Sequence, residues 1–293
     1  MEVELEHILL PTNGLNLHVV RAGPPDGPLV ILLHGFPDFW YSWRRQIETL
    51  AAQGYWVWAP DQRGYNLSDK PAAVRDYGLE ALAADCLGLL EAAGRAQACV
   101  VGHDWGAVVA WWLGMYHADR VRHLHILNVP HPGVMDRAVR SQLRQLRKSW
   151  YVFFFQLPWF PEWAAGRQSW EPLVNMLQTA AQAGSFDSAD FDAYRAAWSQ
   201  PHAFTSMLNW YRAAVRRSLL HPLPRKRVSV PTHIIWGRQD IALDFSLVQP
   251  SLALCDQGRL TVFDDASHWV HLDQAGAVNR LLLDDLAAWN RVQ

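Results

Sequence analysis

The sequence predicts an α/β protein in which a mostly parallel sheet is covered by helices on both faces. Two observations support this fold class. Short apolar runs alternate with longer stretches of helical periodicity, and most runs are apolar throughout, as in strands buried on both sides. A third observation, one long interval without such runs, predicts a helical insertion into the sheet.

The predicted strands are short runs that contain no Asp, Glu, Lys or Arg. They occupy residues 30–33, 57–59, 99–101, 124–127, 233–236 and 260–263. The predicted helices include residues 43–52, 79–93 and 107–116, where apolar side chains recur at helical spacing. Since parallel strands need a long crossover between them, we expect helices to connect these strands.

The regular alternation stops near His131 and resumes near Val228. The interval between them has a mostly helical pattern and many aromatic residues, and no run in it resembles a buried strand. We therefore predict a core formed by residues 1–131 and 228–293, with residues 132–227 as an inserted helical cap.

The densest aromatic stretch of the chain, residues 150–160, lies in the predicted cap. If it is helical, Trp150, Phe153 and Phe154 share one face, whereas Tyr151 and Phe155 share another. We expect both faces to be buried. Simple packing explains these rings, except that the Tyr151 hydroxyl needs a polar partner when buried.

The composition of the 293-residue chain indicates a globular protein, with 50% hydrophobic and 18% charged residues. The net charge of −2 gives no reason to expect nucleic acid as a partner. Three cysteines without a Cys-x-x-Cys pair predict neither a disulfide framework nor a zinc site. The first residues lack a secretion signal, and no apolar run is long enough for a membrane span, so we expect a cytoplasmic protein.

Two groups of polar residues have simple structural explanations. Basic residues recur at helical spacing in the predicted cap, which indicates a solvated face, with contact to an anionic membrane surface as the alternative. They are Arg137, Arg140, Arg144, Arg147 and Lys148. Five histidines, His103, His117, His123, His125 and His131, match no metal-ligand spacing, so we expect no metal site.

A glycine-flanked motif follows the predicted strand at residues 99–101. It reads Gly102-His103-Asp104-Trp105-Gly106 and precedes a predicted helix. This is the context of a nucleophile elbow, a sharp turn that exposes its middle side chain. Here that side chain is a carboxylate, which is anionic at neutral pH and can attack saturated carbon to form an enzyme ester. We predict Asp104 as the nucleophile.

An acid and a histidine follow two later predicted strands. Asp240 lies in the turn after residues 233–236, and His268 follows residues 260–263. The chain order nucleophile, acid, histidine is that of the α/β-hydrolase fold, in which the acid orients the histidine. Each residue alone is compatible with an ordinary loop. Together they predict that His268, oriented by Asp240, activates the water that cleaves the ester.

Charge that develops on the ester carbonyl needs fixed donors. The predicted strand at residues 30–33 ends in the turn His34-Gly35-Phe36-Pro37. In this fold, one backbone N–H comes from the residue after the nucleophile and another from such an earlier loop. We therefore predict Trp105 and Phe36 as the oxyanion donors.

Two tyrosines of the cap distinguish between substrates. Tyr151 and Tyr211 both lie in helical stretches, where simple packing is the alternative explanation. A phenol stays protonated above neutral pH and can donate to a developing alkoxide. Opening of an epoxide gains from such a donor, whereas a departing halide needs no proton.

The motifs resemble those of the epoxide hydrolases of the α/β-hydrolase fold, over nearly the whole chain. They are His34-Gly35-Phe36-Pro37, residues 63–69, the elbow at residues 102–106, Tyr151 before Phe155-Gln156, Asn209-Trp210-Tyr211-Arg212, Asp240 and Ser267-His268-Trp269. The resemblance implies the same roles for the nucleophile, the acid, the histidine, the two tyrosines and the two oxyanion donors. Residues 63–69 are expected to form a structural loop.

Two departures from related families bear on the substrate. Phe36 stands where many haloalkane dehalogenases have an asparagine, and Trp105 stands where fluoroacetate dehalogenases have an arginine. We predict cofactor-free hydrolysis of an epoxide to a vicinal diol through an aspartyl ester, with a small epoxide and water as partners. The alternatives are a haloalkane or haloacid dehalogenase that uses the same aspartate, and a non-catalytic ligand-binding protein of this fold.

Overall fold

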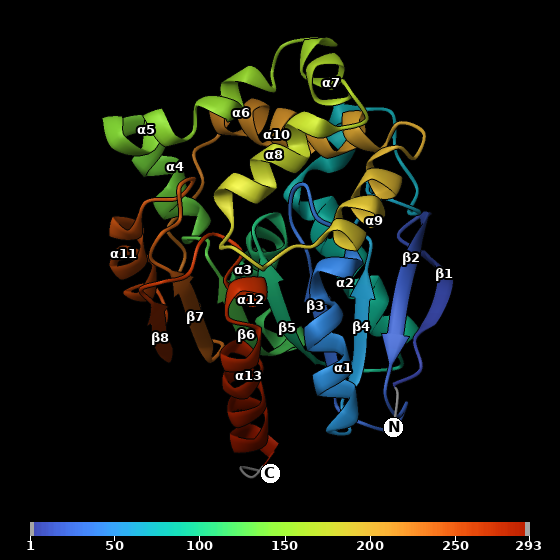
Figure 1. Ribbon diagram of the computed structural model, residues 1–293. Helices are drawn as coiled ribbons and strands as arrows, with labels where there is room; N and C mark the ends of the chain where they lie inside the picture. Colours follow the sequence, from blue (N-terminus) through green and yellow to red (C-terminus); the bar gives the residue numbers. More distant parts are fainter. Residues whose placement is uncertain (1–2, 291–293) are drawn as a thin grey trace.

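The computed structural model describes residues 3–290, which form one sheet of eight strands covered by helices (Figure 1). The strands are β1 (Glu6–Thr12), β2 (Leu15–Ala22), β3 (Leu29–Leu33), β4 (Trp56–Pro60), β5 (Ala98–His103), β6 (Val121–Leu127), β7 (Thr232–Gly237) and β8 (Gly258–Phe263). Their order across the sheet is β1-β2-β4-β3-β5-β6-β7-β8, and every pair from β4 to β8 is parallel. The predicted fold class is confirmed.

The sequence analysis missed the antiparallel hairpin of β1 and β2 at one edge. The outer strand β1 exposes alternate residues, and both strands carry charged side chains, so neither is an uncharged apolar run. The turn between them was nevertheless detectable. Asn13 and Gly14 adopt φ values of 49° and 76°, which is the left-handed backbone that an Asn-Gly hairpin turn requires.

Each predicted strand has a counterpart in the structure, but the strand at residues 260–263 is less buried than expected. Strand β8 pairs only with β7 and forms an edge of the sheet, so its residues Leu260 to Phe263 are half-buried. An apolar run does not reveal whether a strand is central or at the edge, because that depends on its neighbours.

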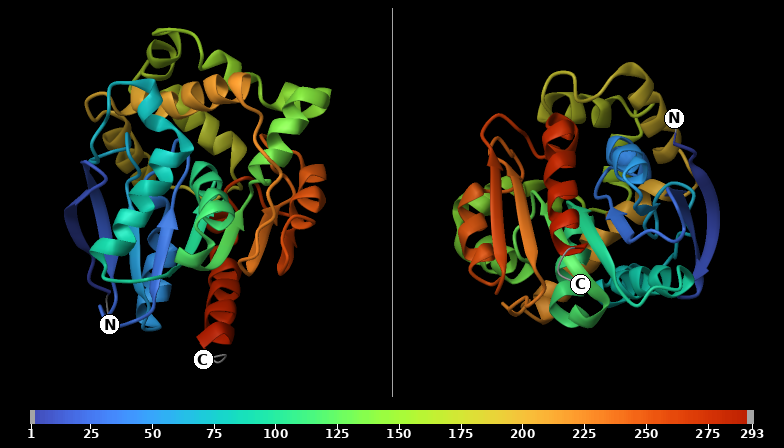
Figure 2. Two further views of the ribbon diagram at one scale, coloured as in Figure 1. Left: turned by 180° about the vertical axis from the view of Figure 1, so that it is seen from behind. Right: turned by 90° about the horizontal axis from the view of Figure 1, so that it is seen from below.

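Helices cover both faces of the sheet (Figures 1 and 2). On one face α1 (Arg44–Ala52) and α13 (Ala275–Asn290) pack against Val30 and other strand side chains, and on the opposite face α2 (Leu79–Ala92) and α3 (Trp105–Tyr116) pack against Ile31 and its neighbours. Two short helices, α11 (Val248–Leu252) and α12 (Val270–Asp273), lie near β7 and β8. None of the helices in residues 3–290 is both long and apolar enough to cross a membrane.

A group of helices interrupts the sheet between β6 and β7 and lies over the carboxyl ends of the strands (Figure 1). They are α4 (Pro132–Ser141), α5 (Leu143–Lys148), α6 (Trp150–Phe154), α7 (Phe160–Ala165), α8 (Glu171–Ala180), α9 (Ser188–Trp198) and α10 (Ala203–Leu220). β6 and β7 are paired neighbours, with Leu124 opposite Thr232. The insertion thus leaves and re-enters the sheet at one place.

The expectation that both faces of the aromatic stretch are buried is wrong. Phe155 is buried, but the side chains of Trp150 and Phe153 are 65% and 51% exposed. The physical reason is the length of α6, which has only five residues and lies at the outer side of the cap. One side of this short helix meets the protein interior, and within residues 3–290 no element covers Trp150 on the other.

Candidate active site

Asp104 follows the last residue of β5 and precedes α3. Its φ of 49° and ψ of −124° are a strained backbone conformation for a residue with a side chain, as in a nucleophile elbow. The backbone around this strained turn packs closely, and glycines lie at the positions where a side chain would collide. A Cβ atom on Gly106 would lie 2.0 Å from the Leu33 carbonyl oxygen, and one on Gly35 would lie 2.2 Å from Cβ of Asp104.

The predicted oxyanion donors lie on both sides of Asp104. The parallel register places Leu33 of β3 opposite Gly102 of β5, which brings the turn after β3 next to the elbow. There the backbone N–H of Phe36 donates to Oδ1 of Asp104 at 2.7 Å. Trp105 is the first residue of α3, directly after Asp104. The backbone at the start of a helix has free N–H groups, which suit it to hold negative charge.

The structure brings Asp240 and His268 together with Asp104. Asp240 follows β7 and His268 follows β8, so all three lie at the carboxyl ends of parallel strands. His268 Nδ1 lies 2.7 Å from Oδ2 of Asp240, and His268 Nε2 lies 3.5 Å from Oδ2 of Asp104. Both His268 and Asp240 are 5% exposed, so water reaches them little.

Asn128 is a residue of this site that the sequence analysis missed. It follows β6 with a φ of 52°, and its Nδ2 donates to Oδ2 of Asp240 at 2.9 Å. Its Oδ1 accepts from the Gly237 N–H at 2.8 Å. Oδ1 of Asp240 accepts from the backbone N–H groups of Ala242 and Leu243, both at 2.8 Å. The sequence feature that indicates Asn128 as a site residue is its position directly after the predicted strand at residues 124–127.

The charges of the three groups stabilise one another. Although burial opposes a charged imidazole, the carboxylate of Asp240 and that of Asp104 raise the pKa of His268 to about 10. Burial also opposes a charged carboxylate, but hydrogen bonding to His268 and its positive charge lower the pKa of Asp104. The same histidine lowers the pKa of Asp240 against its burial. At neutral pH the resting site therefore holds an imidazolium between two carboxylates.

The two predicted tyrosines come from different cap helices and meet above Asp104. Tyr151 lies on α6 and Tyr211 on α10, and their ring centroids are 5.9 Å apart. Both line a cavity of about 400 Å³ together with Asp104 and Trp105. Loss of hydration and the negative charge of Asp104 raise the pKa of each phenol well above its usual value. Both hydroxyls therefore stay protonated.

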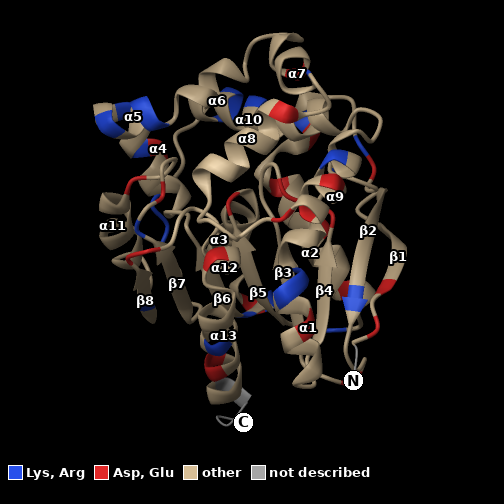
Figure 3. Cartoon of the chain, viewed as in Figure 1, with Lys and Arg blue, Asp and Glu red and all other residues tan. Residues whose placement is uncertain are grey.

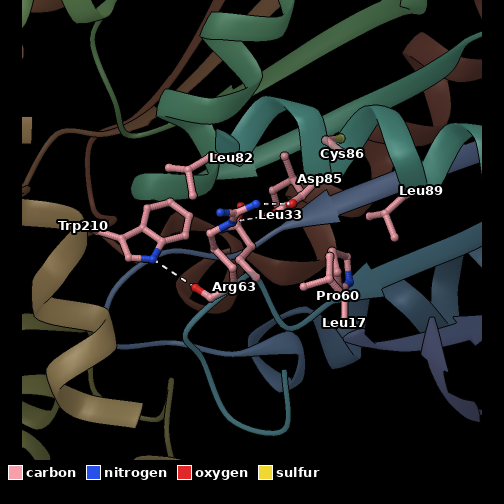
Figure 4. A pocket seen from close by; sticks show the side chains of 10 residues that line it. Leu17, Leu33, Pro60, Arg63, Leu82, Asp85, Cys86, Leu89 and Trp210 are labelled. Atoms are coloured by element: carbon pink, nitrogen blue, oxygen red, sulfur yellow. Dashed lines mark hydrogen bonds and ion pairs between the residues drawn. The ribbon is translucent and has the colours of Figure 1, made fainter. Parts of the chain in front are cut away.

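The loop at residues 63–69 holds α10 in place. Arg63 forms a buried ion pair with Asp85 of α2, and its carbonyl oxygen accepts from Trp210 Nε1 at 3.1 Å (Figure 4). The space enclosed here measures about 10 Å³, room for one water molecule at most. Because Trp210 precedes Tyr211, this anchor fixes where that phenol lies.

Helix α5 contacts the loop that carries Asp240. Lys148 Nζ donates to the Asp240 carbonyl oxygen at 2.9 Å, and the fully buried Gln145 donates to the Ala242 carbonyl and accepts from the Asp244 N–H. The expectation of a solvated basic face therefore fails at Lys148, which packs against this loop. It holds for Arg144, whose side chain is 78% exposed although it pairs with Asp244.

Two groups of described residues have ligand atoms close enough for a metal ion. They are Asp38, His103 and His271, and His125, His233 and Asp285. Hydrogen bonds within the protein already engage both carboxylates. Asp38 accepts from Tyr194 Oη at 2.8 Å, and Asp285 pairs with Arg259 as well as with both of its histidines. These contacts account for the two carboxylates as parts of the folded structure.

Further contacts of the histidines singled out in the sequence support a structural role. His103 Nε2 lies 2.9 Å from the His268 carbonyl oxygen, and His131 caps α4 by accepting from the Gly133 N–H. The rings of His123 and His125 lie 5.1 Å apart. His117 is the residue that follows α3.

Comparison with known proteins places these features in a family. A family profile described as alpha/beta hydrolase fold matches residues 28–275. The AB hydrolase superfamily protein YfhM of Bacillus subtilis is 42% identical over 94% of this chain and 96% of its own length. Epoxide hydrolase 4 of Homo sapiens is 35% identical over 94% of this chain and 77% of its own length.

Solved structures agree with this relationship. The crystal structure of a Bacillus megaterium epoxide hydrolase in complex with an inhibitor has a TM-score of 0.86 and 29% sequence identity, and the match covers 96% of this chain and 100% of that chain. The predicted resemblance is confirmed, and with it the expectation of an enzyme. The chain belongs to the α/β-hydrolase fold family and, within it, to the epoxide hydrolases.

Proposed function

We propose that this enzyme hydrolyses an epoxide to a vicinal diol through an ester of Asp104. The observation that carries the proposal is the position of the Asp104 carboxylate in one cavity with the phenols of Tyr151 and Tyr211. The core, residues 1–131 and 228–293, supplies the groups that make and cleave the ester. The cap, residues 132–227, supplies the proton donors, and the substrates are a small epoxide and water.

In the first step Asp104 attacks a ring carbon. The Phe36 N–H holds Oδ1, so Oδ2 is the oxygen free to form the new bond to carbon. As the ring C–O bond breaks, its electron pair goes to the ring oxygen, which takes a proton from one of the phenols. The products of this step are an alkyl ester of Asp104 and a phenolate. Oδ1, now the ester carbonyl oxygen, already lies beside an oxyanion donor.

In the second step His268 acts as a base. Ester formation removes the negative charge of Asp104, one of the causes that raise the pKa of His268, so the imidazolium releases its proton, and by way of solvent this proton returns the phenolate to a phenol. Water then adds to the ester carbonyl carbon and gives a proton to His268, while the N–H groups of Phe36 and Trp105 hold the charge on Oδ1. Asp240 keeps the imidazole in orientation throughout.

The tetrahedral intermediate collapses by breaking the bond to the departing alkoxide. That oxygen takes the proton from His268, and the proton of the reformed carboxyl group then passes to His268, which restores the imidazolium between two carboxylates. The former ester oxygen of Asp104 leaves with the diol, and the oxygen of water stays in the enzyme. This exchange of oxygen atoms gives the proposal a direct test.

A single turnover in oxygen-18 water, with enzyme in excess over epoxide, is the decisive experiment. We expect the label in Asp104 of the recovered enzyme and unlabelled oxygen in the diol. Label that enters the diol from solvent in this first turnover would contradict the covalent route. A direct attack by water would give that result.

Assays of a panel of epoxides and chloroalkanes, with diol formation and halide release as readouts, test the alternatives. The Phe36 ring lies 5.4 Å from Phe155 and 5.3 Å from Tyr211, so an apolar ring packs against Tyr211 at this position and no side-chain amide is offered to a halide. We expect diol formation from epoxides and little halide release from chloroalkanes. A non-catalytic binding protein would instead show saturable binding, no turnover and no ester adduct in His268→Gln.

A further inference from the structure

The outer side of the cap carries a group of exposed large apolar side chains, named here the cap patch. Its members are Leu143, Trp150, Phe153, Leu157, Trp159, Phe160 and Trp163, on or next to helices α5 to α7. The side chain of Trp159 is 70% exposed and that of Phe160, the least exposed member, 38%. Single exposed apolar residues are common, but a contiguous group of this kind marks an interaction surface.

Ring contacts show that the cap patch is continuous. The ring of Trp150 lies 6.1 Å from that of Phe154, which lies 5.8 Å from Phe160. The Phe160 ring in turn lies 6.0 Å from Trp159 and 5.5 Å from Trp163. These aromatic side chains therefore present one apolar surface to solvent.

The charge of the cap differs in sign from that of the core. Residues 132–227 contain 13 Lys and Arg against 6 Asp and Glu, a balance of +7. Since the whole chain has a net charge of −2, the remaining residues carry −9. Next to the cap patch, α5 carries three basic residues, Arg144, Arg147 and Lys148, and no acidic one (Figure 3). Asp136 pairs with Arg140, Asp244 with Arg144 and Lys148, and Glu162 with Arg212. Among the described residues of α4 and α5, the exposed basic side chains outside these ion pairs are Arg137 and Arg147.

The cap patch reaches the entrance of the catalytic cavity. Phe153, half exposed in the cap patch, lines the same cavity as Asp104 and Tyr151. Leu219, 76% exposed near the end of α10, lines it as well. The cavity thus opens at a surface that is apolar and bordered by basic side chains.

We propose that the cap docks on an anionic phospholipid surface through the cap patch and the exposed basic residues Arg137 of α4 and Arg147 of α5. Tryptophan rings favour the boundary between lipid and water, and Lys and Arg are attracted to anionic headgroups. An apolar surface bordered by basic residues combines both contributions. Charge also argues against a second copy of this chain as the occupant, because two caps of +7 repel each other.

Flotation with lipid vesicles tests this proposal. The purified full chain is mixed with vesicles of phosphatidylcholine alone, or of phosphatidylcholine with phosphatidylglycerol, at low salt and at about 0.15 M salt, where charges are screened beyond about 8 Å. We expect binding to the anionic vesicles that weakens as salt rises. Trp159→Ser combined with Trp163→Ser is expected to lower the partition coefficient roughly tenfold or more.

A second variant tests the contribution of charge. Arg137 and Arg147 are exposed, so Arg137→Glu combined with Arg147→Glu is expected to lower binding to anionic vesicles roughly tenfold or more. The matched control reverses two exposed arginines of the core, Arg75→Glu with Arg280→Glu, and should bind as the parent does. None of these residues lines the catalytic cavity, so turnover of a water-soluble epoxide should stay unchanged in all variants.

Three results would overturn the proposal. One is equal binding to neutral and anionic vesicles at low salt, and another is equal binding of the cap and core variants. The third is a dimer, measured by sedimentation, that the tryptophan variant dissociates. In that case the cap patch would be an interface between copies of the chain.

Discussion

His268 Nε2 lies 3.5 Å from Oδ2 of Asp104, whereas its other ring nitrogen lies only 2.7 Å from Asp240. The imidazole therefore lies closer to the acid than to the nucleophile, with which it makes the longer contact. This arrangement suits a group that must release its contact with Asp104 once the ester forms and then bind a water molecule. It leads to the first prediction.

His268→Gln should separate the two steps. Glutamine cannot take a proton from water, so the ester should form and then persist. Mass spectrometry of the variant after incubation with an epoxide should show an addition of the substrate mass on the peptide that contains Asp104. The double variant that also carries Asp104→Asn should show no addition. An unmodified peptide in the single variant would contradict the proposed nucleophile.

Replacement of both cap phenols should block ring opening. Tyr151→Phe and Tyr211→Phe should each lower the rate of ester formation by roughly 10²-fold or more, and together they should abolish it, because no donor remains for the ring oxygen. Tyr65→Phe is the control. Among the described residues, the buried Tyr65 hydroxyl has no hydrogen-bond partner, so its removal should leave both rate and stability unchanged or improve stability. Rapid-quench measurement of ester formation distinguishes the variants.

Asn128→Gly should impair catalysis more than it impairs folding. Glycine tolerates the left-handed backbone at this position, so the variant mainly removes the amide that holds Asp240 and Gly237. A hydrogen bond to a charged group contributes about 1.5–3 kcal/mol, which predicts a fall in kcat of roughly tenfold or more. The matched control is Asn66→Gly, because Asn66 also has a positive φ and donates to a buried aspartate, Asp61. A similar loss of kcat in both variants would show that Asn128 has no specific role.

The contribution of His268 to stability should depend on pH. Its pKa is raised to about 10 in the folded protein, above the value of about 6.5 for an unfolded chain. The folded state therefore binds this proton more tightly, and the stabilisation is complete below about pH 6.5 and is lost as the pH rises through about 10. The difference in Tm between the parent and His268→Gln should thus shrink across this range. A constant difference would mean that the ion pairs of His268 do not stabilise the fold.

Gln145→Leu should loosen the cap from the loop that carries the catalytic acid. The variant leaves the Asp244 N–H and the Ala242 carbonyl without their partner at a fully buried position. An unsatisfied buried group costs about 1–3 kcal/mol, and each kcal/mol lowers Tm by roughly 2–4 °C in a chain of about this size. We also expect a lower kcat. Gln156→Leu, which removes a local bond within the same cap, should change Tm and kcat little.

The sequence predicted the central strands and the elbow because their requirements are local. A strand buried on both faces needs an uncharged apolar run, and a tight elbow needs small neighbours such as Gly102 and Gly106. The edge hairpin of β1 and β2 does not meet the first requirement, because one side of β1 faces solvent. Its local indication is the Asn13-Gly14 turn.

The contacts between distant segments could not be predicted in the same way. Asn128 and Asp240 are 112 residues apart, and nothing near Asn128 in the sequence shows that the two side chains meet. The contact of Lys148 with the Asp240 carbonyl depends likewise on how α5 packs on the sheet. The burial of the aromatic stretch was predicted wrongly because periodicity gives the faces of a helix but not the presence of a neighbour on each.

The insertion enters and leaves the sheet between two adjacent strands, β6 and β7. Under the proposed mechanism, the phenols that activate an oxirane lie on this insertion, while the residues that hydrolyse the acyl bond follow strands outside it. Evolution could therefore change the insertion, and with it the regioselectivity and enantioselectivity of ring opening, while the residues of the hydrolytic step stay the same.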